Sequence, residues 1–173
     1  MEKDIIGFLG ISYSLDELRS ICPKCHTKQE FDSNPELKSE LVRRKAYHAK
    51  IYNNTEISAF PGEIWKDLKE IAGFTDYSVS NFGRVKFKNT IIIQEDEKDK
   101  YGYLVLDPEH TKNVTHSVHV YTMIAYGFLC KLPEDGKHVH HIDNNGYNCR
   151  PENLILLDYE QHSYVHGKFE KKV

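Results

Sequence analysis

The sequence lacks any uninterrupted apolar run near the roughly 20 residues that a membrane-spanning helix needs. Its N-terminus, MEKDIIGFLG, has neither the basic segment nor the long apolar stretch of a secretory signal. Four cysteines are few, and in a reducing compartment they are expected to be thiols or metal ligands rather than disulfides. We therefore expect a cytoplasmic protein without a membrane partner.

An excess of positive charge is missing as well. The 23 Lys and Arg residues are outnumbered by 26 Asp and Glu, which argues against a histone-like coating of nucleic acid but leaves local patches open. Eleven Tyr, eight Phe and one Trp provide enough apolar surface for a core, which argues against global disorder. A length of 173 residues excludes a large multidomain enzyme.

Residues 1–60 are expected to form a helical N-terminal extension. Ser14 can cap a short helix over Leu15–Arg19, because Glu17 stands three residues later and completes a capping box. A second helix is expected from Pro35 to Tyr52, since an Asn precedes it and proline suits the first helical position.

The same extension contains a CxxC pair, Cys22 and Cys25, with the spacing of a zinc knuckle. A structural zinc needs four ligands, and no second CxxC is present. His26, Cys130 and Cys149 are the available partners elsewhere in the chain. Two interpretations stay open, a structural zinc site and a pair of reduced structural thiols.

Residues 61–117 are typical of a small β-rich unit. Alternating apolar and polar residues predict strands, and Asn81–Gly83 predicts the turn between the first two of them. The expected strands are Tyr77–Ser80, Arg84–Lys88, Thr90–Gln94, Tyr101–Leu106 and one near Val114–Val118.

Two groups of positive charges are candidate DNA contacts. Arg84, Lys86 and Lys88 alternate along one predicted strand, so they should form a basic stripe on one face of the sheet. Arg43 and Arg44 lie on the second predicted helix, where they form either a solvated face or a surface along a phosphate backbone.

Residues 118–173 carry most of the histidines and begin with an apolar helical pattern over Val118–Leu129. A strand ending at the histidine doublet, a turn at Asp143–Gly146 and an apolar strand over Asn153–Leu157 are expected to follow. Asp158 is a good N-cap for a final helix. The order of elements is strand, loop, strand and helix.

The histidine spacing in this last part points to a metal site. His162 and His166 are four residues apart on the predicted helix, so both imidazoles leave the same face. In the doublet His140–His141, neighbouring side chains of a strand point to opposite faces. One can therefore join a metal site while the other serves as a general base, a role that a neutral imidazole can fill near neutral pH.

Residues 139–166, VHHIDNNGYNCRPENLILLDYEQHSYVH, resemble the HNH motif of ββα-metal nucleases, which include phage homing endonucleases. The resemblance implies His140 and His162 as metal ligands, with His166 as a third ligand that only some branches have. It implies His141 as the general base and Asn153 as the residue that braces the loop and orients that base. Many phage relatives have Asp and Asn at the two ligand positions, whereas this chain has His at both.

The middle of the chain resembles NUMOD4, a module that accompanies HNH domains in phage homing endonucleases. The matching segments include Asp76–Tyr77, Val79–Asn81 and Phe82–Val85, and the two resemblances together cover roughly residues 63–166. The module implies a contribution to DNA contact. The C-terminal helical DNA-binding repeats of many relatives find no counterpart here.

The expected fold is α+β: a helical extension (1–60), a small antiparallel β-sheet module (61–117) and a ββα-metal unit (118–173). The function that the resemblance implies is metal-dependent hydrolysis of double-stranded DNA by a phage-type HNH homing endonuclease, without a small-molecule cofactor. Imidazole ligands suit Zn²⁺, Ni²⁺ or Mn²⁺ better than Mg²⁺, although Mg²⁺ or Mn²⁺ is expected in turnover. The alternatives are a non-catalytic DNA-binding protein on the same scaffold and an HNH ribonuclease.

His119 and His138 are interpreted as packing or hydrogen-bonding residues, of which His138 can also reach a phosphate.

Overall fold

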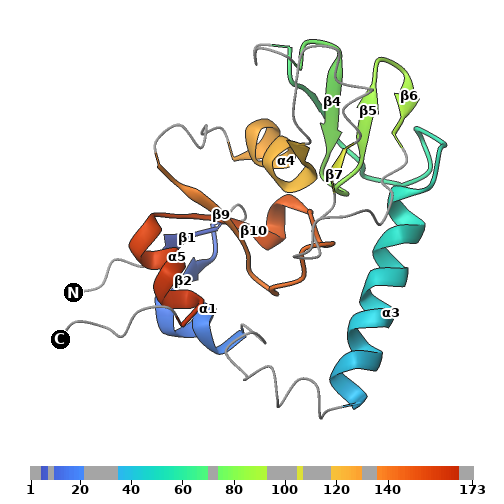
Figure 1. The fold of residues 1–173 in the computed structure, drawn as a ribbon. Helices are drawn as coiled ribbons and strands as arrows, with labels where there is room; N and C mark the ends of the chain where they lie inside the picture. Colours follow the sequence, from blue (N-terminus) through green and yellow to red (C-terminus); the bar gives the residue numbers. More distant parts are fainter. Residues whose placement is uncertain are drawn as a thin grey trace.

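The computed structural model describes residues 5–7, 10–21, 35–69, 74–92, 105–106, 118–129 and 136–167. Within them the chain is α+β, as expected, and every sheet is antiparallel with two to four strands (Figure 1). No helix in these segments combines the length and apolar character that crossing a bilayer requires. Cys22 and Cys25 lie outside the described residues, so the zinc knuckle stays a prediction.

The N-terminal segment is a short hairpin followed by a helix. β1 (Ile5–Ile6) pairs with β2 (Ser12–Tyr13), and α1 covers Leu15–Ile21. The predicted capping box is confirmed: the Ser14 backbone N–H donates to the Glu17 carboxylate at 2.7 Å, and the Glu17 N–H donates to the Ser14 hydroxyl at 3.2 Å. The hydrogen bonds that mark the start of α1 thus come from residues at its own N-terminus.

The second helix, α3, covers Pro35–Tyr52, as its sequence predicts. Among the α3 side chains that the structure describes, the buried ones are His48, Ile51 and Tyr52, all in the last turns. Figure 1 shows the N-terminal end of α3 extending away from the strands. The apolar residues Ile51 and Tyr52 explain why the C-terminal end of α3 packs on the protein.

The middle of the chain forms a four-stranded sheet in the order β3-β4-β5-β6. The registers pair Trp65 with Ser80 and Val79 with Val85. A separate ladder joins β7 to β8. The six strands are β3 (Trp65–Asp67), β4 (Tyr77–Ser80), β5 (Val85–Phe87), β6 (Thr90–Ile91), β7 (Val105–Leu106) and β8 (Val118–His119).

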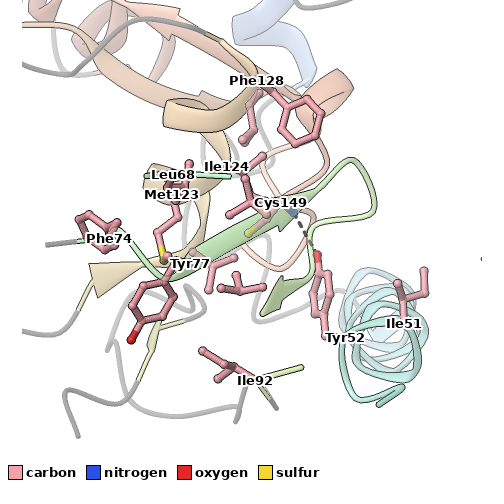
Figure 2. Packing of buried hydrophobic residues seen from close by; sticks show 14 residues of the cluster. Ile51, Tyr52, Leu68, Phe74, Tyr77, Ile92, Met123, Ile124, Phe128 and Cys149 are labelled. Atoms are coloured by element: carbon pink, nitrogen blue, oxygen red, sulfur yellow. Dashed lines mark hydrogen bonds between the residues drawn. The ribbon is translucent and has the colours of Figure 1, made fainter. Parts of the chain in front are cut away.

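Helix α4 (Val120–Phe128) covers one face of this sheet and begins two residues later than expected, because Val118 and His119 belong to β8. Close approach depends on Gly127, where an added Cβ would meet a methyl group of Val79 at 2.5 Å. Met123, Ile124 and Phe128 are buried in the core that Figure 2 shows. α4 therefore joins the sheet to the C-terminal part of the chain.

The C-terminal part has the expected strand, loop, strand and helix. β9 (His138–His141) pairs with β10 (Leu154–Leu157), the 3-10 turn η4 (Pro151–Asn153) precedes β10, and α5 (Tyr159–Val165) follows it. We call β9, β10 and α5 the ββα unit.

A second core fixes the N-terminal segment to the ββα unit. Leu18 of α1 is fully buried among Ile142, Leu157 and Val165, which is on α5. The Tyr164 hydroxyl of α5 donates to the Asp16 carboxylate at 2.5 Å. The two described helices of residues 1–60 thus belong to different cores. α1 packs on the ββα unit, and the end of α3 packs in the core of Figure 2.

The prediction that Arg84 belongs to an exposed basic stripe is wrong. Its side chain is fully buried in an ion pair with Glu63 (2.6 Å), and its guanidinium also donates to the backbone carbonyls of Asn54, Glu56 and Ile57 at 2.6–3.0 Å. Strand alternation does place Arg84 and Lys86 on the same side, where both cations lie over the Trp65 ring. The segment leading to β3 covers that side at Arg84, and sequence alternation carries no information about such a cover.

Arg84→Ala should lower the free energy of unfolding by about 3–5 kcal/mol, because it leaves the Glu63 carboxylate buried and unpaired. Lys86→Ala is the matched control, with a loss below about 1 kcal/mol, since its ammonium contacts an aromatic ring at a partly exposed position. Urea denaturation of both variants measures the difference. Equal stability of the two variants would contradict a structural role for Arg84.

Candidate active site

The histidine doublet is divided between the two faces of the β9–β10 hairpin. His141 is opposite Leu154 and His140 is opposite Ile155 in the antiparallel register. The His140 ring lies near α5, whereas the His141 ring contacts Tyr121 of α4. The divergence expected from strand alternation is therefore present.

Three imidazoles meet on the α5 side of the hairpin. The ring centroids of His140 and His166 are 5.0 Å apart, and those of His162 and His166 are 4.5 Å apart. The start of α5 is set by a capping box, in which Asp158 accepts from the Gln161 N–H (2.8 Å) and the Gln161 side chain accepts from the Asp158 N–H (2.9 Å). This cap fixes where α5 begins, and the four-residue spacing puts His162 and His166 on the same face of the helix.

The three histidines fit a metal ion. One potential ligand atom from each of His140, His162 and His166 lies within 4.8 Å of the others. Two imidazole nitrogens bound to one ion, each at about 2.1 Å, are at most about 4.2 Å apart, so modest ring rotations suffice. His140 is buried while the other two are half-buried, so the cluster is partly accessible to solvent.

His141 lies on the α4 side of the hairpin. Its ring is edge-on to Tyr121, with centroids 5.3 Å apart, and its exposed fraction is 4%. Tyr121 in turn stacks with His119 at 5.0 Å. The carbonyl oxygen of His141 accepts a hydrogen bond from the Asn144 N–H at 2.8 Å. The sequence identified His141 but not its aromatic neighbour, because Tyr121 belongs to a helix that the fold alone brings here.

Asn153 ties the two ends of the loop between β9 and β10 together. Its Oδ1 accepts from the Asp143 N–H at 3.0 Å, and its Nδ2 donates to the Asp143 carboxylate and to the Asn148 carbonyl, both at 2.8 Å. Its own carbonyl accepts from the Ile142 N–H at 2.8 Å. Asn153 thus holds the backbone that directly follows His141.

Asp143 is the second centre of this loop, and the sequence identified it only as a turn residue. Its carboxylate accepts hydrogen bonds from the Asn145 N–H, the Asn148 side chain and the Asn153 side chain, each at 2.8 Å. Asn144 adopts a left-handed conformation with φ of 54°, which Asn tolerates better than most residues. Asn148 therefore takes part in the bracing, in addition to forming the turn.

The end of α3 is joined to the same loop through Tyr52 (Figure 2). Its hydroxyl donates to the Tyr147 carbonyl and accepts from the Cys149 N–H at 3.0 Å. Gly83 permits this approach, since an added Cβ would lie 2.9 Å from the Tyr52 ring. Burial raises the pKa of the Cys149 thiol, so this free cysteine stays protonated near neutral pH.

His48 lies one helical turn before Tyr52, and its ring stacks on that tyrosine with centroids 6.0 Å apart. Burial lowers the pKa of His48, and the nearby Asp143 carboxylate opposes the shift. The shift indicates a neutral imidazole beside the loop near pH 7. No sequence pattern distinguished His48 from an exposed helical residue.

The predicted DNA-contacting residues lie apart from the histidine cluster. Arg43 and Arg44 are exposed on α3, and Lys86 is half-buried with its ammonium 4.7 Å from the centre of the Trp65 ring. Lys88 has a left-handed φ of 54° in the turn after β5, where its ammonium lies over Phe87. Strand alternation therefore does not extend to Lys88.

Substituting His140, His162 or His166 with Ala should weaken binding of Mn²⁺, Ni²⁺ or Zn²⁺, because each removes one nitrogen ligand from the cluster. At a concentration of 100 times its Kd, a bound ion stabilises the folded state by about 2.7 kcal/mol, so the ion-induced rise in Tm should shrink in each variant. Calorimetric titration measures the affinity. The matched control is His119→Ala, which lies outside the cluster, and unchanged affinity in the His140/His162 double variant would exclude this site.

Asn153→Asp should loosen the loop despite its nearly equal size. It replaces the Nδ2 donor with a charged oxygen beside the Asp143 carboxylate, and the lost hydrogen bonds cost about 1–3 kcal/mol of folding free energy. We also expect at least about a tenfold fall in turnover, because the backbone after His141 loses its brace. Denaturation and single-turnover cleavage assays measure the two effects. A variant with wild-type stability and turnover would reduce Asn153 to an ordinary turn residue.

Known proteins match this chain in the two regions just described. The profile of the HNH endonuclease family matches residues 118–164, and the NUMOD4 motif matches residues 63–107. An uncharacterized HNH endonuclease of Acanthamoeba polyphaga mimivirus is 37% identical over 94 residues, which is 53% of this chain and 23% of the viral protein.

A solved structure described as DNA binding and cleavage by the HNH homing endonuclease I-HmuI is also similar. It has a TM-score of 0.43 and 23% identity, and the match covers 62% of this chain and 61% of that one. The chain thus spans less than a quarter of the viral relative and about three fifths of the solved one. The histidine cluster and the Asn153 loop lie mostly within the first matched region, and the four-stranded sheet lies within the second. The chain carries an HNH endonuclease domain preceded by a NUMOD4 motif.

Proposed function

We propose that this protein is a metal-dependent endonuclease of the homing type that hydrolyses phosphodiester bonds of double-stranded DNA, by a nick or a double-strand break. The observation that carries the proposal is the division of the histidine doublet. His140 joins two other imidazoles on one face of the hairpin. His141 lies on the other face, directly before the loop that Asn153 holds by hydrogen bonds. In the mechanism proposed here, phosphodiester hydrolysis uses a metal site together with a separate general base.

On this proposal His140, His162 and His166 hold one divalent ion. Such an ion supplies Lewis-acid stabilisation of the negative charge that develops on the leaving oxygen. An all-imidazole ligand set favours Zn²⁺, Ni²⁺ or Mn²⁺ over Mg²⁺, which prefers oxygen ligands. The residues on α5 and β9 therefore set which ions bind.

The remaining chemistry belongs to the protein. His141 takes a proton from the attacking water as the general base. Asn153 is a positioning residue: its hydrogen bonds to Asp143 and Asn148 fix the loop backbone, so the His141 ring keeps one orientation. Tyr121 limits the movement of that ring from the α4 side.

DNA contact on this proposal involves Lys86 and Lys88 of the sheet and Arg43 and Arg44 of α3. All four are basic residues at partly or fully exposed positions. Tyr52 fixes α3 to the loop between β9 and β10. Phosphate contacts of this kind position the duplex without sequence preference. Arg84 has no part in this surface, because its charge is used inside the fold.

His141→Ala should lower single-turnover cleavage of supercoiled plasmid by about 100- to 10,000-fold, the usual contribution of a general base. DNA binding measured with the uncleaved substrate should stay within a few-fold of wild type, because the base acts on water. Wild-type cleavage should require added metal and stop with EDTA. Parallel assays with duplex DNA, single-stranded DNA and RNA separate a DNase from a ribonuclease, and intact binding without cleavage in any metal would indicate a non-catalytic DNA-binding protein.

Replacing Lys86, Lys88, Arg43 or Arg44 with Ala should weaken binding to all DNA sequences alike. Each lost phosphate contact should make the slope of log K against log salt shallower by about one unit. Titrations at several salt concentrations measure the slope. Glu36→Gln on the exposed surface of α3 is the control, because it removes no positive charge. An unchanged slope in the quadruple variant would place these cations away from the DNA.

A further inference from the structure

A fourth histidine, His138, lies beside the cluster formed by His140, His162 and His166. It is two residues before His140 on β9, so the two side chains leave the same face of the strand. His140 is buried with 2% of its surface exposed, whereas His138 is exposed. The same face of β9 thus presents one histidine to the cluster and one to solvent.

The ring of His138 stacks on a member of the cluster. Its centroid is 5.1 Å from that of His162, and the two ring planes differ by only 15°. The centroid of the His138 ring is also 6.0 Å from that of Tyr159, which is 60% exposed. Both contacts are with α5, so His138 is placed at the rim of the cluster.

His138 is outside the ligand set that the geometry defines. The ligand atoms within 4.8 Å of one another come from His140, His162 and His166. Two rings stacked nearly parallel place their nitrogens side by side, whereas ligands of one ion must direct their nitrogens to a common point. The imidazole of His138 therefore keeps its N–H for another partner.

We propose that His138 donates a hydrogen bond to a non-bridging oxygen of the phosphodiester that binds at the three-histidine metal site. This inference rests on the proposed function and adds a residue to it. An imidazole carries at least one N–H in either protonation state, and phosphate oxygens are strong acceptors. Because His138 stacks on the half-buried His162, a phosphate that reaches His162 from solvent also comes within reach of the exposed His138 ring.

A purely structural role for His138 predicts a different result. If the ring serves only to stack on His162 and hold it in place, its nitrogen atoms are dispensable and its aromatic face is not. His138→Phe keeps an aromatic ring without an N–H, whereas His138→Gln keeps an N–H donor without an aromatic ring. The two variants therefore separate donation from stacking.

The experiment measures single-turnover cleavage of supercoiled plasmid at saturating Mn²⁺, together with calorimetric Mn²⁺ affinity and the Tm of the metal-free protein. For His138→Phe we expect Mn²⁺ affinity and Tm near those of wild type and a cleavage rate at least about tenfold lower, since one donor to a reacting phosphate is lost. For His138→Gln we expect a rate between those of wild type and the Phe variant.

A Phe variant that cleaves at the wild-type rate overturns the inference. A Phe variant whose Mn²⁺ affinity falls as much as its rate does so too, because His138 would then act through His162. In both cases wild-type cleavage leaves the proposed function intact. Failure of the wild-type protein to cleave with any divalent metal overturns the proposed function and this inference together.

Discussion

The hydroxyl of Tyr52 joins the parts of this protein that the sequence keeps far apart. It belongs to the last turn of α3, yet it donates to the carbonyl of Tyr147 and accepts from the N–H of Cys149. The ring fits there because Gly83, in the turn between β4 and β5, leaves room for it. One side chain therefore sets the position of α3, of the four-stranded sheet and of the loop that Asn153 braces.

The two cores divide the work of support. The core of Figure 2 holds α4 between the sheet and the β9–β10 hairpin, and so places Tyr121 beside His141. The second core packs α1 against α5, the seven-residue helix that carries two of the clustered histidines. A helix that short is not stable alone in water, so it depends on packing, to which Leu18 and the Asp16–Tyr164 hydrogen bond contribute. Through α1, the N-terminal segment thus supports the three-histidine cluster, and none of its described residues belongs to that cluster.

Charge is used in two ways on the sheet. Arg84 and Lys86 are both near the Trp65 ring, but one forms a buried ion pair and the other stays at the surface. A buried guanidinium is tolerated because Glu63 and three backbone carbonyls satisfy it. Two basic residues on the same side of one strand therefore have different roles: Arg84 is a structural anchor and Lys86 is a candidate phosphate contact.

The sequence alone determined whatever depends on neighbours along the chain. Four features follow from local geometry alone: the capping boxes at Ser14 and Asp158, the bounds of α3, the divergence of His140 from His141, and the shared face of His162 and His166. Only the tertiary structure decided which side chains are covered and which distant groups meet: the burial of Arg84, the Asp143 hydrogen bonds with Asn148 and Asn153, the contact of Tyr121 with His141 and the packing of α1 on α5. The reason is physical, since periodicity fixes the direction of a side chain relative to its own backbone but carries no information about the segment that packs over it.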